Sequence, residues 1–140
     1  MKIYFATAIS ASRMEGTEES NTEFINHLKK YGVVLTEHFA DPAIRDKGET
    51  VINDKEIHDR DMNWLLSAEV IVAEVTNTSL GVGYEIGRAV ENNKRILCLR
   101  RKQERRLSAM IAGSEAITVK VYQTTEEGKK FIDEFFNKSY

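Results

Sequence analysis

The chain has 140 residues, of which 20 are Lys or Arg and 22 are Asp or Glu, so its formal net charge at pH 7 is −2. This balance argues against a nucleic-acid binding protein, which carries a strongly basic field, and no basic amphipathic segment indicates a membrane surface. No apolar run comes near the roughly 20 residues that a membrane span requires. We therefore expect one cytoplasmic domain over residues 1–140, large enough to bury a core of its own.

The amino-terminal part of the chain alternates the patterns of strand and helix. Residues 2–7 are mostly apolar, as in a first strand, and the small and polar residues 8–13 indicate a loop. A helix is expected to begin near Thr17, because acidic residues occupy its first turn and lysines its last, before Gly32. A second strand is expected at 33–37.

The polar segment from 39 to 50 contains the only proline of the chain and is interpreted as a loop or lid over a crevice. The helix after it is expected at 54–67, since Asn53 and Glu56 have the spacing of a capping pair. Asp61 falls on the apolar, core-facing stripe of this helix. A carboxylate in that position is expected to have either a partner or a function.

The stretch from 69 to 91 organises the rest of the chain. Its apolar, β-branched start at 70–75 is typical of a parallel strand that is buried on both faces. Polar residues and two glycines, Gly81 and Gly83, then indicate a tight turn before an amphipathic helix. Glu85 lies on the apolar stripe of that helix, close to the crevice in which open α/β sheets bind their ligands.

The last part of the chain contains two more strand patterns. A strand is expected at 94–99, in which the single cysteine, Cys98, is a buried packing residue rather than a nucleophile. The basic run 100–106 is interpreted as an exposed connection. The other elements expected here are a short helix at 107–111, an edge strand at 117–122 and a final helix at 125–137.

These elements predict an α/β fold, a three-layer sandwich on a five-stranded, mainly parallel sheet of flavodoxin-like or Rossmann-like architecture. The expected strand order is 2-1-3-4-5, which puts the switch point between the first and third strands. The crevice there receives Tyr4, Asp61 and Glu85 in this arrangement. Two carboxylates and a phenol fit cleavage of a glycosidic bond, in which one carboxylate attacks the anomeric carbon.

Simpler roles are open for several of these residues. Asp61 can pair with an arginine or cap a helix, and Glu74, near the end of its strand, can support a site as well as act in one. His38 could touch a ligand from the end of the second strand, whereas His27 and His58 are expected to be structural. The sequence shows no metal-ligand cluster, and we expect no cofactor.

Residues 79–90, Ser-Leu-Gly-Val-Gly-Tyr-Glu-Ile-Gly-Arg-Ala-Val, form a specific motif. Further motifs lie at residues 4–5, 35–38, 57–65, 72–76, 93–99 and 107–111. Together they resemble the 2'-deoxynucleoside 5'-phosphate N-hydrolase family, within the nucleoside 2-deoxyribosyltransferase superfamily. The resemblance covers nearly the whole chain.

The resemblance implies an enzyme that hydrolyses the N-glycosidic bond of a (2'-deoxy)nucleoside 5'-monophosphate to free base and (deoxy)ribose 5-phosphate. Glu85 matches the family's nucleophile, which forms a covalent glycosyl intermediate, and Tyr4 matches the tyrosine that orients it. Asp61 matches the aspartate that positions the sugar and handles the proton of the leaving base. His38 matches a residue on the base side of the pocket.

The resemblance also implies how the substrate is held. Ser79 and Ser108 match phosphate-binding serines, and Ser108 is supplied by the neighbouring subunit of a homodimer. Gly81 and Gly83 lie between Ser79 and the expected nucleophile and are expected to line the same crevice. A serine at position 79 favours a monophosphate, since transferase relatives tend to carry an acidic residue there, and a carboxylate repels a phosphate.

The first loop departs from the family pattern. Family hydrolases typically show Gly-Ser-Ile-Arg-Gly-Gly after the first strand, whereas this chain has Thr-Ala-Ile-Ser-Ala-Ser at 7–12. Ser10 replaces the phosphate-binding arginine and Ala8 the serine, so Ser10 and Arg13 are the candidates for holding phosphate here. Two alternatives stay open. One is a deoxyribosyltransferase that passes the intermediate to another base, and the other is a flavodoxin-like module that binds a flavin or nucleotide without chemistry.

Overall fold

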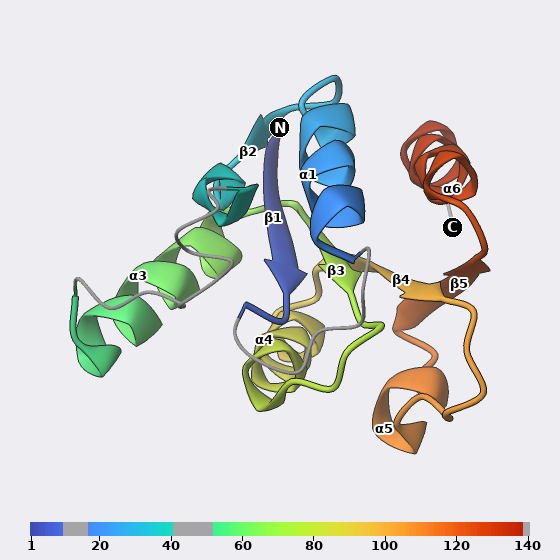
Figure 1. Cartoon of the computed structure of the whole chain (residues 1–140). Helices are drawn as coiled ribbons and strands as arrows, with labels where there is room; N and C mark the ends of the chain where they lie inside the picture. The colour runs from blue at the N-terminus through green and yellow to red at the C-terminus, as the bar shows by residue number, and fades with distance from the viewer. Residues whose placement is uncertain (10–16, 41–51, 139–140) are drawn as a thin grey trace.

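The computed structural model describes residues 1–9, 17–40 and 52–138 of the chain. Strands and helices alternate through this part (Figure 1). The elements are β1 (Lys2–Thr7), α1 (Thr17–Leu28), β2 (Val33–Val34), the 3₁₀ turn η1 (Glu37–Ala40), α3 (Asp54–Ser67), β3 (Val70–Glu74), α4 (Leu80–Glu91), β4 (Arg95–Arg101), α5 (Ala109–Ala112), β5 (Ile117–Tyr122) and α6 (Thr125–Asn137).

The described strands form one sheet in the order β2-β1-β3-β4-β5, and each neighbouring pair is parallel. This confirms the predicted fold class and strand order, with the switch point between β1 and β3. The register of these two strands pairs Tyr4 with Ile71 and Thr7 with Glu74. The chain therefore leaves β1 and β3 at the same edge of the sheet, where open α/β sheets form their crevice.

Helices cover both faces of the sheet, which makes three layers (Figure 1). On one face, Val70 and Val72 of β3 join a core that includes residues of α1 and α6. On the other face, Ile71 and Ala73 pack with residues of α3 and α4. Cys98 lies in this second core, fully buried as predicted, and burial raises the pKa of its thiol to about 12. Alternation along single strands therefore fills two separate cores.

Most element boundaries agree with the sequence-based prediction. The elements at 2–7, 54–67, 117–122 and 125–137 match it residue for residue. By contrast, α1 ends at Leu28, several residues before Gly32, and β2 ends at Val34 instead of continuing to position 37. Of the segment 39–50 interpreted as a lid, positions 39 and 40 belong to η1 and the rest lies outside the described residues.

A side chain replaces the backbone ladder where β2 ends early. Thr36 is fully buried, and its Oγ1 accepts a hydrogen bond from the Phe5 N–H at 2.9 Å and donates one to the Phe5 carbonyl at 2.8 Å. Both backbone groups of Phe5 are thereby satisfied without a further residue of β2. The chain can therefore leave the sheet and enter η1.

The prediction that 100–106 is an exposed connection was wrong at its start. β4 continues to Arg101, and Arg100 is only 7 % exposed. The Arg100 guanidinium donates hydrogen bonds to the carbonyls of Val75 and Arg105. Two backbone carbonyls therefore accept hydrogen bonds from a guanidinium group that the sequence pattern predicted to be exposed to solvent.

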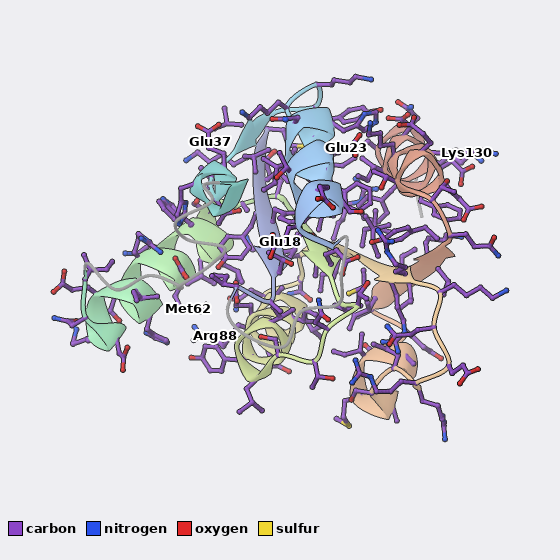
Figure 2. All side chains as sticks on the ribbon, viewed as in Figure 1. Glu18, Glu23, Glu37, Met62, Arg88 and Lys130 are labelled. Atoms are coloured by element: carbon purple, nitrogen blue, oxygen red, sulfur yellow. The ribbon has the colours of Figure 1, made fainter. Side chains whose placement is uncertain are left out.

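Charged side chains extend outward from helices on both faces of the sheet. Glu23 on α1, Lys130 on α6 and Arg88 on α4 are examples (Figure 2). Both signs of charge are thus interspersed, as a formal net charge of −2 suggests. In the part of the chain that the structure describes, no helix combines the length and the apolar character needed to cross a membrane.

Candidate active site

A carboxylate of α4 meets a buried phenol of β1. Tyr4 is fully buried, on the face of the sheet that packs against α3 and α4. Its hydroxyl donates a hydrogen bond to Oε2 of Glu85. Glu85 is half-buried and directly precedes Ile86, which belongs to the same core. The structure thus joins two predicted site residues that are 81 positions apart in the chain.

The helix that carries Glu85 begins earlier than predicted. Ser79 is its N-cap, and the serine Oγ accepts a hydrogen bond from the Val82 N–H at 3.3 Å. Gly81 and Gly83 therefore lie inside α4 and not in the turn before it. A Cβ added at Gly83 meets no atom within 4 Å, and one at Gly81 meets only the Ser79 Oγ, at 3.8 Å. Both glycines leave bare backbone on an open side of the helix.

Burial and charge set the protonation of the Tyr4–Glu85 pair. Burial raises the pKa of Glu85 to about 7; the hydrogen bond from Tyr4 lowers it, and the charge of Asp61 raises it further. Burial also raises the pKa of Tyr4 well above its usual range, with added contributions from Glu85 and Asp61, while Arg60 opposes them. The phenol therefore stays protonated as a donor, whereas the carboxyl group of Glu85 titrates near neutrality.

Asp61, on α3, lies close enough to influence both groups. Its side chain is 14 % exposed, and its Oδ1 accepts hydrogen bonds from Nε and Nη2 of Arg60 at 3.0 and 2.9 Å. The simpler role considered for Asp61, a pair with an arginine, is therefore present. The charge of Asp61 also raises the pKa of Glu85, so Asp61 acts on the site although it pairs with Arg60.

An aromatic side chain lies beside this ion pair. The guanidinium carbon of Arg60 is 4.7 Å from the centroid of the Trp64 ring, which projects from the same helix one turn later. The imidazole of His38 approaches Trp64 with 5.4 Å between ring centroids. His38 comes from η1 and not from the end of a strand, since β2 is shorter than predicted. The structure therefore brings His38 to the Asp61 side of the site.

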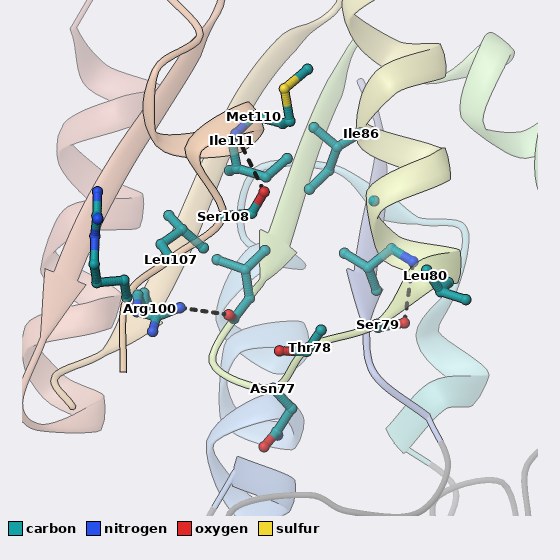
Figure 3. Close-up of a pocket in the computed structure, with 14 residues that line it drawn as sticks. Asn77, Thr78, Ser79, Leu80, Ile86, Arg100, Leu107, Ser108, Met110 and Ile111 are labelled. Atoms are coloured by element: carbon teal, nitrogen blue, oxygen red, sulfur yellow. Dashed lines mark hydrogen bonds between the residues drawn. The ribbon is translucent and has the colours of Figure 1, made fainter. Parts of the chain in front are cut away.

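Ser79 and Ser108 line a cavity of about 300 Å³ (Figure 3). Each serine caps the helix that follows it, and Arg100 and Arg106 line the same cavity. Neither the two carboxylates nor the phenol is among its described lining residues, so the cavity is a neighbour of the Tyr4–Glu85 pair and does not contain it. Both serines belong to one protomer here; the contribution of Ser108 across a dimer interface stays a prediction.

The remaining predicted positions lie elsewhere. Ser10 and Arg13 lie outside the described residues. His27 bonds to Asp133 on α6 at 2.7 Å, and His58 contacts Asp59 and Tyr84 on the surface. Within the described ranges, no group of three or more His, Cys, Asp or Glu side chains is placed to hold a metal ion.

A family model described as nucleoside 2-deoxyribosyltransferase matches residues 3–132. The chain belongs to the nucleoside 2-deoxyribosyltransferase family. This confirms the resemblance seen in the sequence.

Within the deoxyribosyltransferase family, the chain is similar to proteins named as hydrolases. It is 46 % identical to the 5-hydroxymethyl-dUMP N-hydrolase of Danio rerio, with 97 % of this chain and 96 % of that protein covered. It is also 46 % identical to the putative 2'-deoxynucleoside 5'-phosphate N-hydrolase 1 of Trichoplax adhaerens, with 96 % and 92 % covered. A solved structure, that of the CMP N-glycosidase BcmB of Clostridium botulinum, matches with a TM-score of 0.69 at 16 % identity, over 96 % of this chain and 99 % of that one. At this identity the match shows a shared fold.

Sequence reasoning missed three residues of this deoxyribosyltransferase-family protein. Arg60 could have been found, because it precedes Asp61 and is spaced four residues from Trp64, as stacked helical pairs are. Thr76 is only two residues after Glu74, whereas Tyr122, 48 positions after Glu74, had no local signal. They bind the side chain of Glu74, which lies on the α1 and α6 face of the sheet, away from the Tyr4–Glu85 pair.

Proposed function

We propose that this protein hydrolyses the N-glycosidic bond of (2'-deoxy)nucleoside 5'-monophosphates, releasing the free base and (deoxy)ribose 5-phosphate. The observation that carries the proposal is the half-buried Glu85, held by the Tyr4 hydroxyl beside a second carboxylate, Asp61. Relatives that align over nearly the whole chain are named as N-hydrolases of deoxynucleotides. Chemistry and family membership therefore favour the same bond.

In the first step we assign to Glu85 the role of nucleophile. Its carboxylate attacks the anomeric carbon while the bond to the base breaks, and the base departs with the bonding electron pair. Tyr4 holds the attacking group in line by donating to its second oxygen. Asp61 accepts a hydrogen bond from the sugar and relays a proton from solvent to the departing base, so its own charge is unchanged after the step.

In the second step water attacks the anomeric carbon of the glycosyl ester. The carbon–Glu85 bond breaks, the Glu85 carboxylate is released, and the proton of the water passes through Asp61 to solvent, which replaces the proton that the base took up. Two inversions give net retention at the anomeric carbon. Retention is testable with methanol as a competing nucleophile, since the methyl glycoside should keep the configuration of the substrate. An inverted product would contradict the covalent route.

The phosphate is assigned to the amino end of α4. Ser79 caps this 12-residue helix, whose free N–H groups and dipole favour an anion. Gly81 and Gly83 let a ligand approach the backbone there, because no side chain covers them. Ser108, Ser10 and Arg13 complete the proposed phosphate site. A serine cap is compatible with a phosphate dianion, whereas an acidic cap repels it.

The proposal includes a homodimer in which Ser108 reaches the neighbouring active site. Leu80 is 93 % and Met110 81 % exposed, and Tyr84 is also exposed, so large apolar groups cluster beside α4 and α5 without cover in one protomer. Mixing the variants Glu85→Gln and Ser108→Ala, each of which we expect to be inactive alone, tests the exchange. Mixed dimers carry one site with both native residues, so activity should return if Ser108 acts across the interface, and stay absent if it acts within its own chain. The cytoplasmic location is part of the same proposal, with cell fractionation as its test.

The family name keeps transfer as a second candidate function. A transferase passes the Glu85-bound sugar to another base instead of water. Incubating a nucleotide with an isotopically labelled second base distinguishes the two, because labelled nucleotide forms only by transfer.

The central experiment measures base release from ribo- and deoxyribonucleoside 5'-monophosphates and from the matching nucleosides, with wild type and Glu85→Ala. We expect wild type to release the base from the monophosphates and Glu85→Ala to release none. Release from nucleosides alone would move the assignment to the transferase side of the family. Release that persists in Glu85→Ala would remove Glu85 from the mechanism.

A further inference from the structure

Arg60 makes an unusual contact for a helical residue. Neighbouring positions on a helix point about 100° apart, so the side chains of residues i and i+1 do not normally face each other. Arg60 nevertheless turns back to its neighbour and donates two hydrogen bonds, from Nε and Nη2, to the same oxygen of Asp61. The side chains of the pair are 27 % and 14 % exposed, so it is mostly withdrawn from solvent.

The Trp64 ring lies against the guanidinium group of this pair. Its position four residues after Arg60 puts it on the same side of α3, and the guanidinium carbon lies 4.7 Å from the ring centroid. The guanidinium carbon thus lies over the indole while Nε and Nη2 point to the carboxylate of Asp61. The contact continues to His38, whose ring approaches Trp64 from η1.

We propose, on the basis of the function proposed above, that Arg60 is a positioning residue that holds the Asp61 carboxylate beside Glu85 by means of its contact with Trp64. Arg60 itself touches no reacting atom in this assignment. It acts through Asp61, and it offsets the negative charge that two neighbouring carboxylates create in the site.

The electrostatics of the site agree with this role. Tyr4 from β1 and Asp61 from α3 both act on Glu85, in opposite directions. Arg60 lowers the pKa of Tyr4, against the effects of burial, Glu85 and Asp61. Arg60 therefore adds positive charge within reach of Tyr4, the donor to Glu85, while it binds Asp61.

A lysine cannot reproduce the arrangement. Its ammonium group is a compact point charge that lacks the planar fork, so it cannot lie on the indole and bind one carboxylate oxygen through two N–H groups at once. Arg60→Lys therefore keeps the positive charge but loses the planar guanidinium, while Arg60→Gln loses both. A matched control is Lys55→Gln, which breaks the exposed pair of Lys55 with Asp59 on the same helix.

The test compares kcat and KM for base release among these variants, with wild type and Glu85→Gln measured alongside to establish the reaction itself. Arg60→Gln should lower kcat roughly tenfold to a hundredfold, the range for paired charge-assisted hydrogen bonds, with little change in KM. Arg60→Lys should fall between Arg60→Gln and wild type, and Lys55→Gln should match wild type. In an Asp61→Asn background, Arg60→Gln should cause less than about a threefold further loss.

Two results would overturn the assignment: an unchanged kcat in Arg60→Gln, or the same loss in the native and Asp61→Asn backgrounds. The pH profile separates positioning from a general loss of structure. Without the positive charge, the acid limb of kcat/KM should move to higher pH, because the negative charge of Asp61 near Glu85 is no longer offset. A limb that stays in place while kcat falls would also contradict the role.

The contact itself can be followed without turnover. Trp64 is the only tryptophan of the chain, so the intrinsic tryptophan emission reports on this ring alone. Arg60→Gln should change the emission, and Lys55→Gln should not. An unchanged spectrum in Arg60→Gln would exclude the stacked support even if the reaction itself proves different from the one proposed.

Discussion

In the part of the chain that the structure describes, two buried tyrosines each donate a hydrogen bond to a glutamate, one on each face of the sheet. On the α3 and α4 face the Tyr4 hydroxyl donates to Glu85, and on the α1 and α6 face the Tyr122 hydroxyl donates to Glu74. Both tyrosines are fully buried. The chemical groups and the hydrogen bond are the same, so the surroundings account for the difference between the pairs.

Glu74 is fully supplied with donors. It is 2 % exposed; its Oε1 accepts from the Thr76 N–H at 2.7 Å, and its Oε2 accepts from the Thr76 hydroxyl at 2.8 Å and from Tyr122. Burial raises the pKa of Glu74, and the hydrogen bonds from Tyr122 and Thr76 oppose that effect. Thr76 in turn accepts from the Arg101 N–H and the Gln103 amide, so this network ties the turn after β3 to the end of β4.

Glu85 has fewer donors and a like charge for a neighbour. Within the described residues it accepts one hydrogen bond, from Tyr4, and the charge of Asp61 acts on it. The two carboxylates therefore differ in the number of donors that hold them, three for Glu74 and one for Glu85, the proposed nucleophile. A carboxylate whose lone pairs are already occupied has little capacity left for a substrate.

The largest contrast should appear when the same change is made in both pairs. Glu85→Gln removes the proposed nucleophile and should lower kcat roughly 10³-fold or more. Glu74→Gln should keep activity per folded molecule within a few-fold of wild type. Base release, normalised to folded protein by circular dichroism, measures both. Comparable losses of kcat in the two variants would contradict the proposed difference between Glu85 and Glu74.

The loss of stability should follow the opposite order, with the larger loss at Glu74. Glu74→Ala leaves the Thr76 N–H, the Thr76 hydroxyl and the Tyr122 hydroxyl without their acceptor, and should lower the free energy of unfolding by about 2–4 kcal/mol. Urea unfolding at fixed protein concentration measures the change. The exposed Glu104→Gln serves as the control, expected within about 0.5 kcal/mol of wild type. A loss below about 1 kcal/mol in Glu74→Ala would show that the network adds little.

Glu85→Gln should stabilise the protein at high pH. The pKa of Glu85 in the folded protein, about 7, lies above its ordinary value of 4.5, so the folded protein holds this proton more tightly than the unfolded chain. The contribution of Glu85 is therefore fully present below about pH 4.5 and is lost as the pH rises through 7. Glutamine does not ionise, so the variant should be more stable by about 2–3 kcal/mol at pH 8 and nearly equal to wild type at pH 4.5. Thermal unfolding at the two pH values measures the gap; a gap that does not grow with pH would contradict the raised pKa.

The smallest effect concerns the acid limb of kcat/KM. It should lie near pH 7 in wild type, because the proposed mechanism requires an ionised Glu85. Tyr4→Phe removes a hydrogen bond to the ionised form and should move the limb to higher pH, whereas Asp61→Asn removes a negative neighbour and should move it lower. Each shift is expected to be about half to one pH unit. Shifts in the same direction in both variants would show that the two residues do not act on Glu85 as assigned.

Much of the fold was readable from the sequence because its elements carry local signals. Asn53 caps α3 as its spacing with Glu56 predicted. The end of β2 was not readable, since it depends on the Thr36 side chain meeting β1, 31 positions earlier in the chain. The burial of Arg100 likewise depends on carbonyls in two loops, which no local pattern describes.

The candidate site shows the same division. The sequence identified Tyr4, Asp61 and Glu85 as polar groups on apolar patterns, and Glu74 as a fourth. It could not show that Glu74 faces away from the others. Alternation within β3 is a local property, but the register that sets Thr7 beside Glu74 and the helices that cover each face are tertiary. The partner of Asp61 was also left open, because neighbouring residues of a helix do not normally face each other, whereas in the structure Arg60 binds Asp61.

By itself, then, the sequence determined the alternation of strands and helices, the strand order suggested by that alternation, and the polar residues that interrupt apolar stripes. Hydrophobic periodicity and capping are properties of a few neighbouring residues, so they can be recognised in the sequence alone. Only the tertiary structure decided which tyrosine meets which glutamate, and which carboxylate is satisfied. Those contacts join residues 48 and 81 positions apart, and their electrostatics depend on burial that exists only after the layers have packed.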